Sequence, residues 1–268
     1  MGKPRKRHEQ TQLFGPKGGV PRTRTPTRKR DRRPGRKPNG PRAGSPHKTR
    51  PELSADHPVH VVLRVVRAIG SLRKRLMYAA LRQATITVAL RAELRAETDG
   101  AFRIIHISIQ RTHVHLLVEA DTKLALSRGM QSFQISAAKH LNHAASLKII
   151  KQGGARRRGT VFPDRYHQEI IRTPTQARRT LAYVLNNWRK HREDEASAFA
   201  RTWKVDPFST GALFAGWQER EGKPLLWKTP MTYEPLVVYL PTTWLLQKGW
   251  LRGGGRFSVH HTPSQRPS

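Results

Sequence analysis

The sequence predicts an α+β fold, in which an antiparallel sheet has helices on one face and a further helix follows it. Four segments are β-branched or extended in pattern, and three longer segments have apolar residues at helical spacing. They are interleaved as strand, helix, strand, strand, helix, strand, helix. The first six elements match the ferredoxin-like split βαβ arrangement, and the seventh is an added C-terminal helix.

The first strand and the first helix follow a change in composition at His57. Residues 59–67 are mainly valine, leucine and arginine, and β-branched residues favour a pleated strand. Ser71 is a suitable N-cap for the segment 72–97, where alanine, leucine, arginine and glutamate predict a helix. Asp99-Gly100 predicts the end of this helix.

The second and third strands form a predicted hairpin, followed by two more helices and a fourth strand. Only Arg111 and Thr112 separate the two strands, and two residues suffice for a tight turn. Thr173-Pro174 opens the last helix, because proline is favoured in a helix's first turn. The expected ranges are strands at 102–110 and 113–120, a helix at 124–146, a basic glycine-rich loop at 153–159, an extended segment at 161–172 and the last helix at 175–195.

Three regions are expected along the chain. Residues 1–56 read as a disordered basic arm, because they are rich in arginine, proline and glycine and have little to bury. Residues 57–195 form the folded domain. Residues 196–268 form a tryptophan-rich extension, which we expect to wrap onto the domain or contact DNA and to end in a loose tail from Gly253.

The charge predicts a polyanionic partner. Lysine and arginine total 51 against 18 aspartate and glutamate residues, a formal net charge of +33. Nucleic acid is the usual partner of such a surplus, since phosphate contacts release counterions. No apolar run is long enough for a membrane span, and no secretory signal precedes the domain, so we expect a cytoplasmic protein and no membrane partner. The absence of cysteine excludes disulfides and thiolate metal sites.

Two histidines on the third predicted strand form a candidate metal site. His113 and His115 are two residues apart, so both imidazoles point to one face of the sheet while Val114 points to the other. Imidazole is a common ligand of divalent transition metals. The same pattern is also typical of a polar sheet face in which one histidine is hydrogen-bonded and the other exposed.

Tyr183 and Asn187 form a second candidate pair, on the last predicted helix. They are four residues apart and therefore share a helical face. A tyrosine phenol can attack a phosphodiester and remain bound to the phosphorus, and an amide oxygen can be a third metal ligand. A tyrosine whose ring packs on the core and whose hydroxyl is hydrated is the structural alternative.

Three motifs resemble those of HUH single-tyrosine transposases, in which U is a bulky apolar residue. Residues 112–119 (THVHLLVE) resemble the family's His-U-His hallmark, and residues 181–187 (LAYVLNN) resemble its catalytic helix. Residues 162–167 (FPDRYH) resemble the segment before that helix in the REP-associated tyrosine transposase branch. Thr112 departs from the family's usual asparagine, and Trp188 from a proline that often follows the amide ligand.

The resemblance covers about residues 57–195, and it implies the same split βαβ sheet. By this likeness Tyr183 is the nucleophile, and His113, His115 and Asn187 hold Mg²⁺ or Mn²⁺. It implies an enzyme that cleaves and rejoins single-stranded DNA, which can be folded as a hairpin, through a 5′-phosphotyrosine. The sequence leaves open whether the protein acts alone or as a homodimer.

Other basic and aromatic residues are candidate DNA contacts. For those outside the N-terminal arm, an exposed loop or packing between strands is an equally good explanation. They are Arg28, Lys29, Arg30, Arg32 and Arg33 in the arm, Arg156, Arg157 and Arg158 in the loop, and Arg165, Tyr166 and His167 before the last helix.

Two other functions are consistent with parts of the sequence. A non-catalytic nucleic-acid-binding protein of the same fold would stack bases on aromatic residues of the central strands, but aliphatic residues dominate there. A histidine-triad hydrolase would need a third histidine where Leu117 stands. His106, on the second strand, is expected to be a packed histidine.

Overall fold

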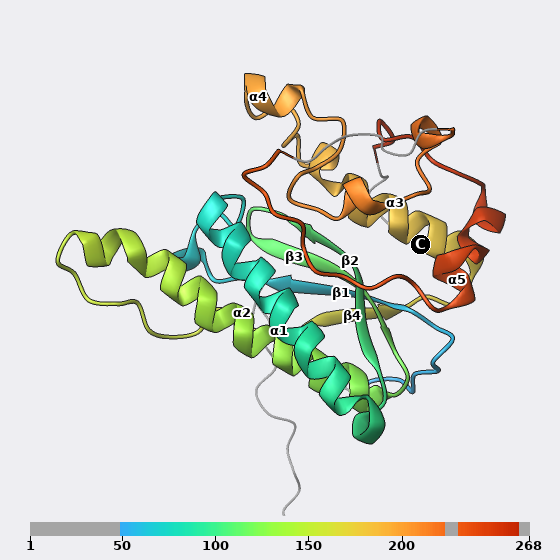
Figure 1. Ribbon diagram of the computed structural model, residues 1–268, viewed down its shortest axis with the longest axis horizontal. Helices are drawn as coiled ribbons and strands as arrows, with labels where there is room; N and C mark the ends of the chain where they lie inside the picture. The colour runs from blue at the N-terminus through green and yellow to red at the C-terminus, as the bar shows by residue number, and fades with distance from the viewer. Residues whose placement is uncertain (1–48, 223–229, 263–268) are drawn as a thin grey trace, which may run out of the picture. The chain divides into compact units, whose positions relative to one another are not determined.

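The computed structural model describes residues 49–222 and 230–262. Its sheet has four strands in the order β2-β3-β1-β4, and all neighbouring strands are antiparallel (Figure 1). The strands are β1 (Val59–Arg64), β2 (Phe102–Ile109), β3 (His113–Ala120) and β4 (His167–Ile170). This is the predicted ferredoxin-like arrangement, and the prediction of fold class is confirmed.

Helices cover both faces of the sheet. α1 (Arg75–Asp99) and α2 (Lys123–Lys151) lie together on one face, whereas α3 (Pro174–Lys190) lies on the other (Figure 1). Side chains alternate along each strand, so the sheet contributes to two separate apolar cores. Val114 and Leu116 enter the core under α1 and α2, while Leu117 joins Leu181 in the core under α3.

Three predicted boundaries were wrong, for local reasons. Ser71 does not cap α1, because the backbone N–H of Leu72 donates to Arg111 O in the hairpin turn at 2.9 Å and the helix begins only at Arg75. α2 extends five residues beyond the predicted end, to Lys151. α3 ends at Lys190, and the chain then turns so that Glu193 forms hydrogen bonds with Arg111.

The segment after α3 wraps onto that helix, as expected of the tryptophan-rich region. Trp217, Trp250 and Phe257 are buried with the apolar side of α3. Two short elements, α5 (Trp244–Gln247) and the 3₁₀ helix η4 (Gly249–Gly253), lie against α3, and a Cβ added at Gly253 would stand 2.3 Å from Pro174 O. The loose tail predicted from Gly253 was wrong as far as Val259, which is only 1% exposed.

Arg50 and Leu53 fall in the stretch that was predicted to be disordered, but both contact the folded domain. Arg50 lies over the ring of Tyr166, with its guanidinium carbon 3.4 Å from the ring centroid, and Leu53 packs against the core under α1 and α2. The arm residues Arg28, Lys29, Arg30, Arg32 and Arg33 lie outside the described residues.

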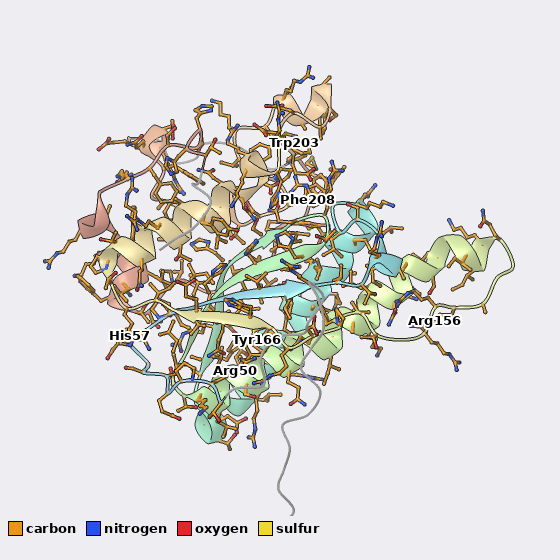
Figure 2. All side chains as sticks on the ribbon, turned by 180° about the vertical axis from the view of Figure 1, so that it is seen from behind. Arg50, His57, Arg156, Tyr166, Trp203 and Phe208 are labelled. Carbon is orange, nitrogen blue, oxygen red and sulfur yellow. The ribbon has the colours of Figure 1, made fainter. Side chains whose placement is uncertain are left out.

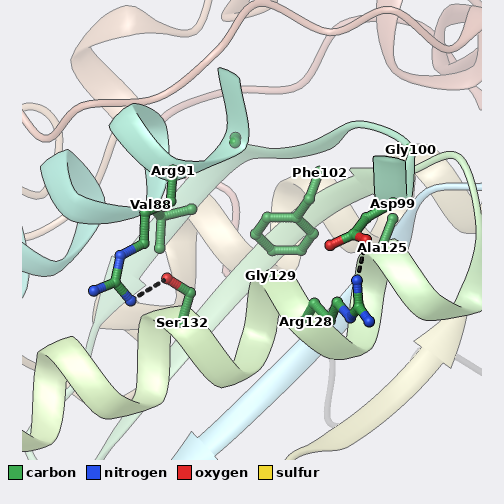
Figure 3. Close-up of a pocket in the computed structure, with 10 residues that line it drawn as sticks. Val88, Arg91, Asp99, Gly100, Phe102, Ala125, Arg128, Gly129 and Ser132 are labelled. Atoms are coloured by element: carbon green, nitrogen blue, oxygen red, sulfur yellow. Dashed lines mark hydrogen bonds and ion pairs between the residues drawn. The ribbon is translucent and has the colours of Figure 1, made fainter. Parts of the chain in front are cut away.

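The packing of α2 on β2 depends on a close approach at Gly129. The ring of Phe102 lies directly over this glycine, and a Cβ there would stand 2.1 Å from Phe102 Cγ (Figure 3). The adjoining cavity has a volume of only about 20 Å³, which is room for about one water molecule and too small for a ligand. No helix in the described part of the chain is both long and apolar enough to cross a membrane.

Candidate active site

The two histidines of β3 lie on the face of the sheet that α3 covers. Their ring centroids are 4.8 Å apart. His115 is buried at 2% exposure, whereas His113 is half-buried at the end of the strand, opposite Arg64 of β1. Strand alternation therefore places both imidazoles side by side, as the sequence predicts.

Helix α3 brings the tyrosine and the amide to the same place. The ring of Tyr183 lies edge-on to that of His115, with 5.3 Å between centroids. Asn187 is fully buried, and its Nδ2 lies 2.8 Å from His115 Nε2. Its Oδ1 has no hydrogen-bond partner among the described residues. The four residues singled out by their spacing thus converge, from two elements about 70 residues apart in the chain.

Three further residues line the cluster, and the sequence reasoning missed them. His60 of β1 has its Nε2 3.0 Å from His115 Nδ1, and the two rings are stacked. His191, at the end of α3, has its ring centroid 5.6 Å from that of His113. The ammonium of Lys190 lies 5.0 Å from the ring centroid of Tyr183. His191 was detectable, since it follows Asn187 by four residues, whereas His60 required the register of β1 on β3.

Burial sets the protonation states of this cluster. Desolvation, followed by the neighbouring His167, lowers the pKa of His60 to about 4. Desolvation, followed by His191 and Arg64, lowers the pKa of His113 to about 4 as well. Desolvation, followed by the neighbouring His60 and His113, places the pKa of His115 well below its usual value. All three imidazoles are therefore neutral at pH 7, which is the form that binds metal. Burial raises the pKa of Tyr183 above 10, so its phenol is protonated.

The donor set suits a divalent cation. His113 Nδ1 lies 3.3 Å from Thr112 Oγ1, which leaves its Nε2 for a ligand. His115 Nδ1 faces His60, and its Nε2 faces Asn187 Nδ2, so a cation bound at Nε2 would replace that amide contact. The partnerless Oδ1 of Asn187 supplies an oxygen beside them. Within the described residues, imidazole and carboxylate groups alone form no cluster of three, so a metal here needs the amide. Two nitrogens, one amide oxygen and water fit Mg²⁺ or Mn²⁺.

The predicted DNA contacts do not gather at this cluster. Arg156 and Arg158 are exposed on the loop after α2, while Arg157 is hydrogen-bonded to Ser146 Oγ and to Thr160 O (Figure 2). Tyr166 packs on the opposite face of the sheet, beneath Arg50.

The residues on either side of Tyr166 differ from it. Arg165 and His167 are exposed, and His167 lies in β4 across from Val62, on the face that bears His60. His106 is packed as expected, with its Nδ1 3.0 Å from Thr210 Oγ1.

A comparison with protein-family models matches residues 56–187 to the family described as "Transposase IS200 like". The matched range contains the whole sheet, both histidines of β3 and α3 as far as Asn187. Over this range, about half of the chain, the sequence is similar to this family of transposases.

Two solved structures are similar to this chain. One is described as a REP-associated tyrosine transposase bound to a REP hairpin; it is 18% identical, the match covers 74% of this chain and all of that one, and the TM-score is 0.43. The other is a candidate transposase from Deinococcus radiodurans R1, with 13% identity, coverage of 51% and 92%, and a TM-score of 0.33. A comparison with curated proteins found no match.

Proposed function

We propose that this protein is a transposase that cleaves and rejoins single-stranded DNA through a covalent 5′-phosphotyrosine at Tyr183. The observation that supports this most directly is the convergence of one phenol, two neutral imidazoles and a buried amide oxygen without a partner. These are the groups that a metal-assisted attack on a phosphodiester needs.

The chemistry is a transesterification. Tyr183 Oη forms a bond to phosphorus, the bond from phosphorus to the 3′-oxygen breaks, and the phenol proton is lost to water while the leaving 3′-oxygen takes up a proton. A 3′-hydroxyl later attacks the phosphotyrosine, which restores the phosphodiester and the phenol. The number of phosphoester bonds does not change, so strand transfer needs no ATP.

His113, His115 and Asn187 would hold Mg²⁺ or Mn²⁺. When bound, the cation supplies charge neutralisation at a non-bridging phosphate oxygen. The protein orients the reacting groups, because α3 fixes Tyr183 and Asn187 one helical turn apart and β3 fixes both imidazoles. Burial of His115 and Asn187 keeps bulk water away from one side of the site.

The basic arm and the exposed arginines of the loop after α2 would bind the DNA backbone. A single strand folded as a hairpin is the partner that we propose. The described residues supply the nucleophile and all three ligands from one chain, so a homodimer is not needed to complete the site.

A labelling experiment tests the proposal. Pools of single-stranded oligonucleotides with random and hairpin segments are incubated with the full chain and Mn²⁺, then resolved on a denaturing gel. A 5′-phosphotyrosine retains the downstream fragment, so 3′-labelled DNA should shift with the protein, and 5′-labelled DNA should only be shortened. Tyr183→Phe should abolish the adduct. Tyr239→Phe is the matched control, because its hydroxyl bonds to Ala89 O away from the histidines.

Two results would contradict the proposal. An adduct that persists in Tyr183→Phe would exclude this nucleophile, and cleavage that needs no divalent cation would exclude the metal site. DNA binding without any adduct would favour a binding-only protein. The fold argues against base stacking on an open sheet, because helices cover both faces.

A further inference from the structure

His60 is a buried polar group to which the proposed reaction assigns no role. It lies in β1, on the same face of the sheet as His115, and its side chain is 5% exposed. It contacts two members of the site. Its Nε2 lies 3.0 Å from His115 Nδ1, and its ring meets that of Tyr183 edge-on at 5.9 Å between centroids. A histidine that only filled space in the core would not need a ring nitrogen directed at Nδ1 of His115, the proposed metal ligand.

The positions of the ring hydrogens determine which of these two nitrogens donates and which accepts. At 3.0 Å, His60 Nε2 and His115 Nδ1 have room for a single hydrogen between them, so one nitrogen donates and the other accepts. The Nδ2 of Asn187 donates toward His115 Nε2, which must then be the unprotonated nitrogen. His115 Nδ1 therefore has the hydrogen and donates it to His60, whose own hydrogen is on Nδ1.

The resulting tautomer is the one that a metal ligand needs. With its hydrogen on Nδ1, His115 has its lone pair on Nε2, where it accepts from Asn187 Nδ2 in the absence of metal, and a bound cation would take that lone pair in place of the amide N–H. Metal-binding histidines are commonly oriented by an acceptor for their other N–H, and loss of that acceptor costs about 10–100-fold in metal affinity.

We propose that His60 is a positioning residue, which accepts the N–H of His115 Nδ1 and thereby fixes both the tautomer and the ring plane of this ligand. The inference rests on the proposed function, since it assumes that His115 binds metal. It adds that His115 needs a hydrogen-bond acceptor at Nδ1, which the phosphotyrosine chemistry alone does not require.

Nitrogen NMR of the metal-free full chain tests the tautomer directly. Long-range ¹H–¹⁵N spectra distinguish a ring protonated on Nδ1 from one protonated on Nε2. In the wild type, His115 should be protonated on Nδ1. His60→Leu, which removes the acceptor but fills space, should shift His115 toward the Nε2-protonated form or a mixture. His60→Gln retains an acceptor oxygen and should preserve more of the Nδ1 form.

Metal binding gives the second readout. Mn²⁺ titration followed by electron paramagnetic resonance should show about a 10–100-fold loss of affinity in His60→Leu and a smaller loss in His60→Gln. His106→Leu is the matched control: it is also a buried histidine on this face, but it bonds to Thr210 and not to a ligand. Its Mn²⁺ affinity should stay within about twofold of the wild type, in line with a substitution that removes no group around the metal.

The proposal fails if wild-type His115 has its hydrogen on Nε2, or if His60→Leu changes neither the tautomer nor the Mn²⁺ affinity. It also fails if His106→Leu weakens Mn²⁺ binding as much as His60→Leu does, since the effect would then be general loosening. These results are independent of the Tyr183→Phe adduct test. His60 can therefore be excluded while the phosphotyrosine reaction stands, and the reverse also holds.

Discussion

A buried carboxylate holds the C-terminal segment over α3, and replacing it should loosen that segment. Glu119 in β3 is fully buried and accepts hydrogen bonds from the backbone N–H and the hydroxyl of Thr242, at 2.8 and 2.6 Å. Its other oxygen accepts the same two kinds of bond from Thr243, at 2.9 and 2.7 Å. Thr243 is also the N-cap of α5, so the carboxylate fixes the start of that helix.

The size of the effect follows from these four bonds. Glu119→Gln keeps the shape but replaces one oxygen with an NH₂ group that faces two donors. Two hydrogen bonds to a charged acceptor are lost, each worth about 1.5–3 kcal/mol, and the other two become neutral. We therefore expect the free energy of unfolding to fall by about 3 kcal/mol. Glu97→Gln, at an exposed position of α1, should change it by less than about 0.5 kcal/mol.

Urea unfolding followed by tryptophan fluorescence measures this difference, since Trp217 and Trp250 are buried with the segment. Amide hydrogen exchange should quicken first at residues 243–257, because the carboxylate anchors them. Phosphotyrosine formation should fall in parallel, since this segment packs on the helix that bears Tyr183. If the two variants unfold within 0.5 kcal/mol of one another, the carboxylate is not the anchor that its geometry indicates.

Three further predictions concern acid stability, helix packing and the arm. The pKa of His106 is lowered to about 4 by burial, so the unfolded chain binds its proton near pH 6.5 and the folded chain does not. The free energy of unfolding should therefore fall as pH drops from 6.5 to 4. His106→Gln should reduce the loss of stability between pH 7 and pH 4.5 by about 2–3 kcal/mol. Denaturant unfolding at pH 7 and at pH 4.5 measures this loss, and an equal loss in wild type and variant would contradict the prediction. Gly129→Ala should lower stability by about 1–3 kcal/mol, because its Cβ would overlap the ring of Phe102. A thermal melt equal to the wild type would show that the ring of Phe102 moves aside without cost. Removal of residues 1–48 should weaken DNA binding and reduce the slope of log affinity against log salt, measured by fluorescence anisotropy, and an equal slope would mean that the arm makes no phosphate contacts.

The strands and the last helix were predictable from local sequence. The two-residue connection Arg111-Thr112 between apolar strands predicted the hairpin, and the spacing of Tyr183 and Asn187 placed them on one helical face before any coordinates. Helix ends were less predictable, since they depend on tertiary bonds such as the one from Leu72 N to Arg111 O. Local propensity at Ser71 was overruled by that contact.

The candidate site was only partly predictable, for a reason of topology. His113, His115, Tyr183 and Asn187 each belong to a pair within one element, and pairs within an element can be read from spacing. His60 belongs to no such pair. Its nearness to His115 depends on the antiparallel register of β1 on β3, in which His60 stands opposite Leu117. Phe257 packs against α3 although the two are more than 60 residues apart in the sequence, and no local pattern predicts such a contact.

Two fully buried polar side chains near the same sheet face show how structural and functional roles separate. Glu119 and Asn187 have equal burial, but the carboxylate has four donors on its two oxygens, whereas the amide oxygen of Asn187 has none among the described residues. An unpaired buried acceptor costs about 1–3 kcal/mol. A complete set of partners identifies Glu119 as an anchor, whereas the unused oxygen of Asn187 is the group that we propose as a ligand of a bound cation.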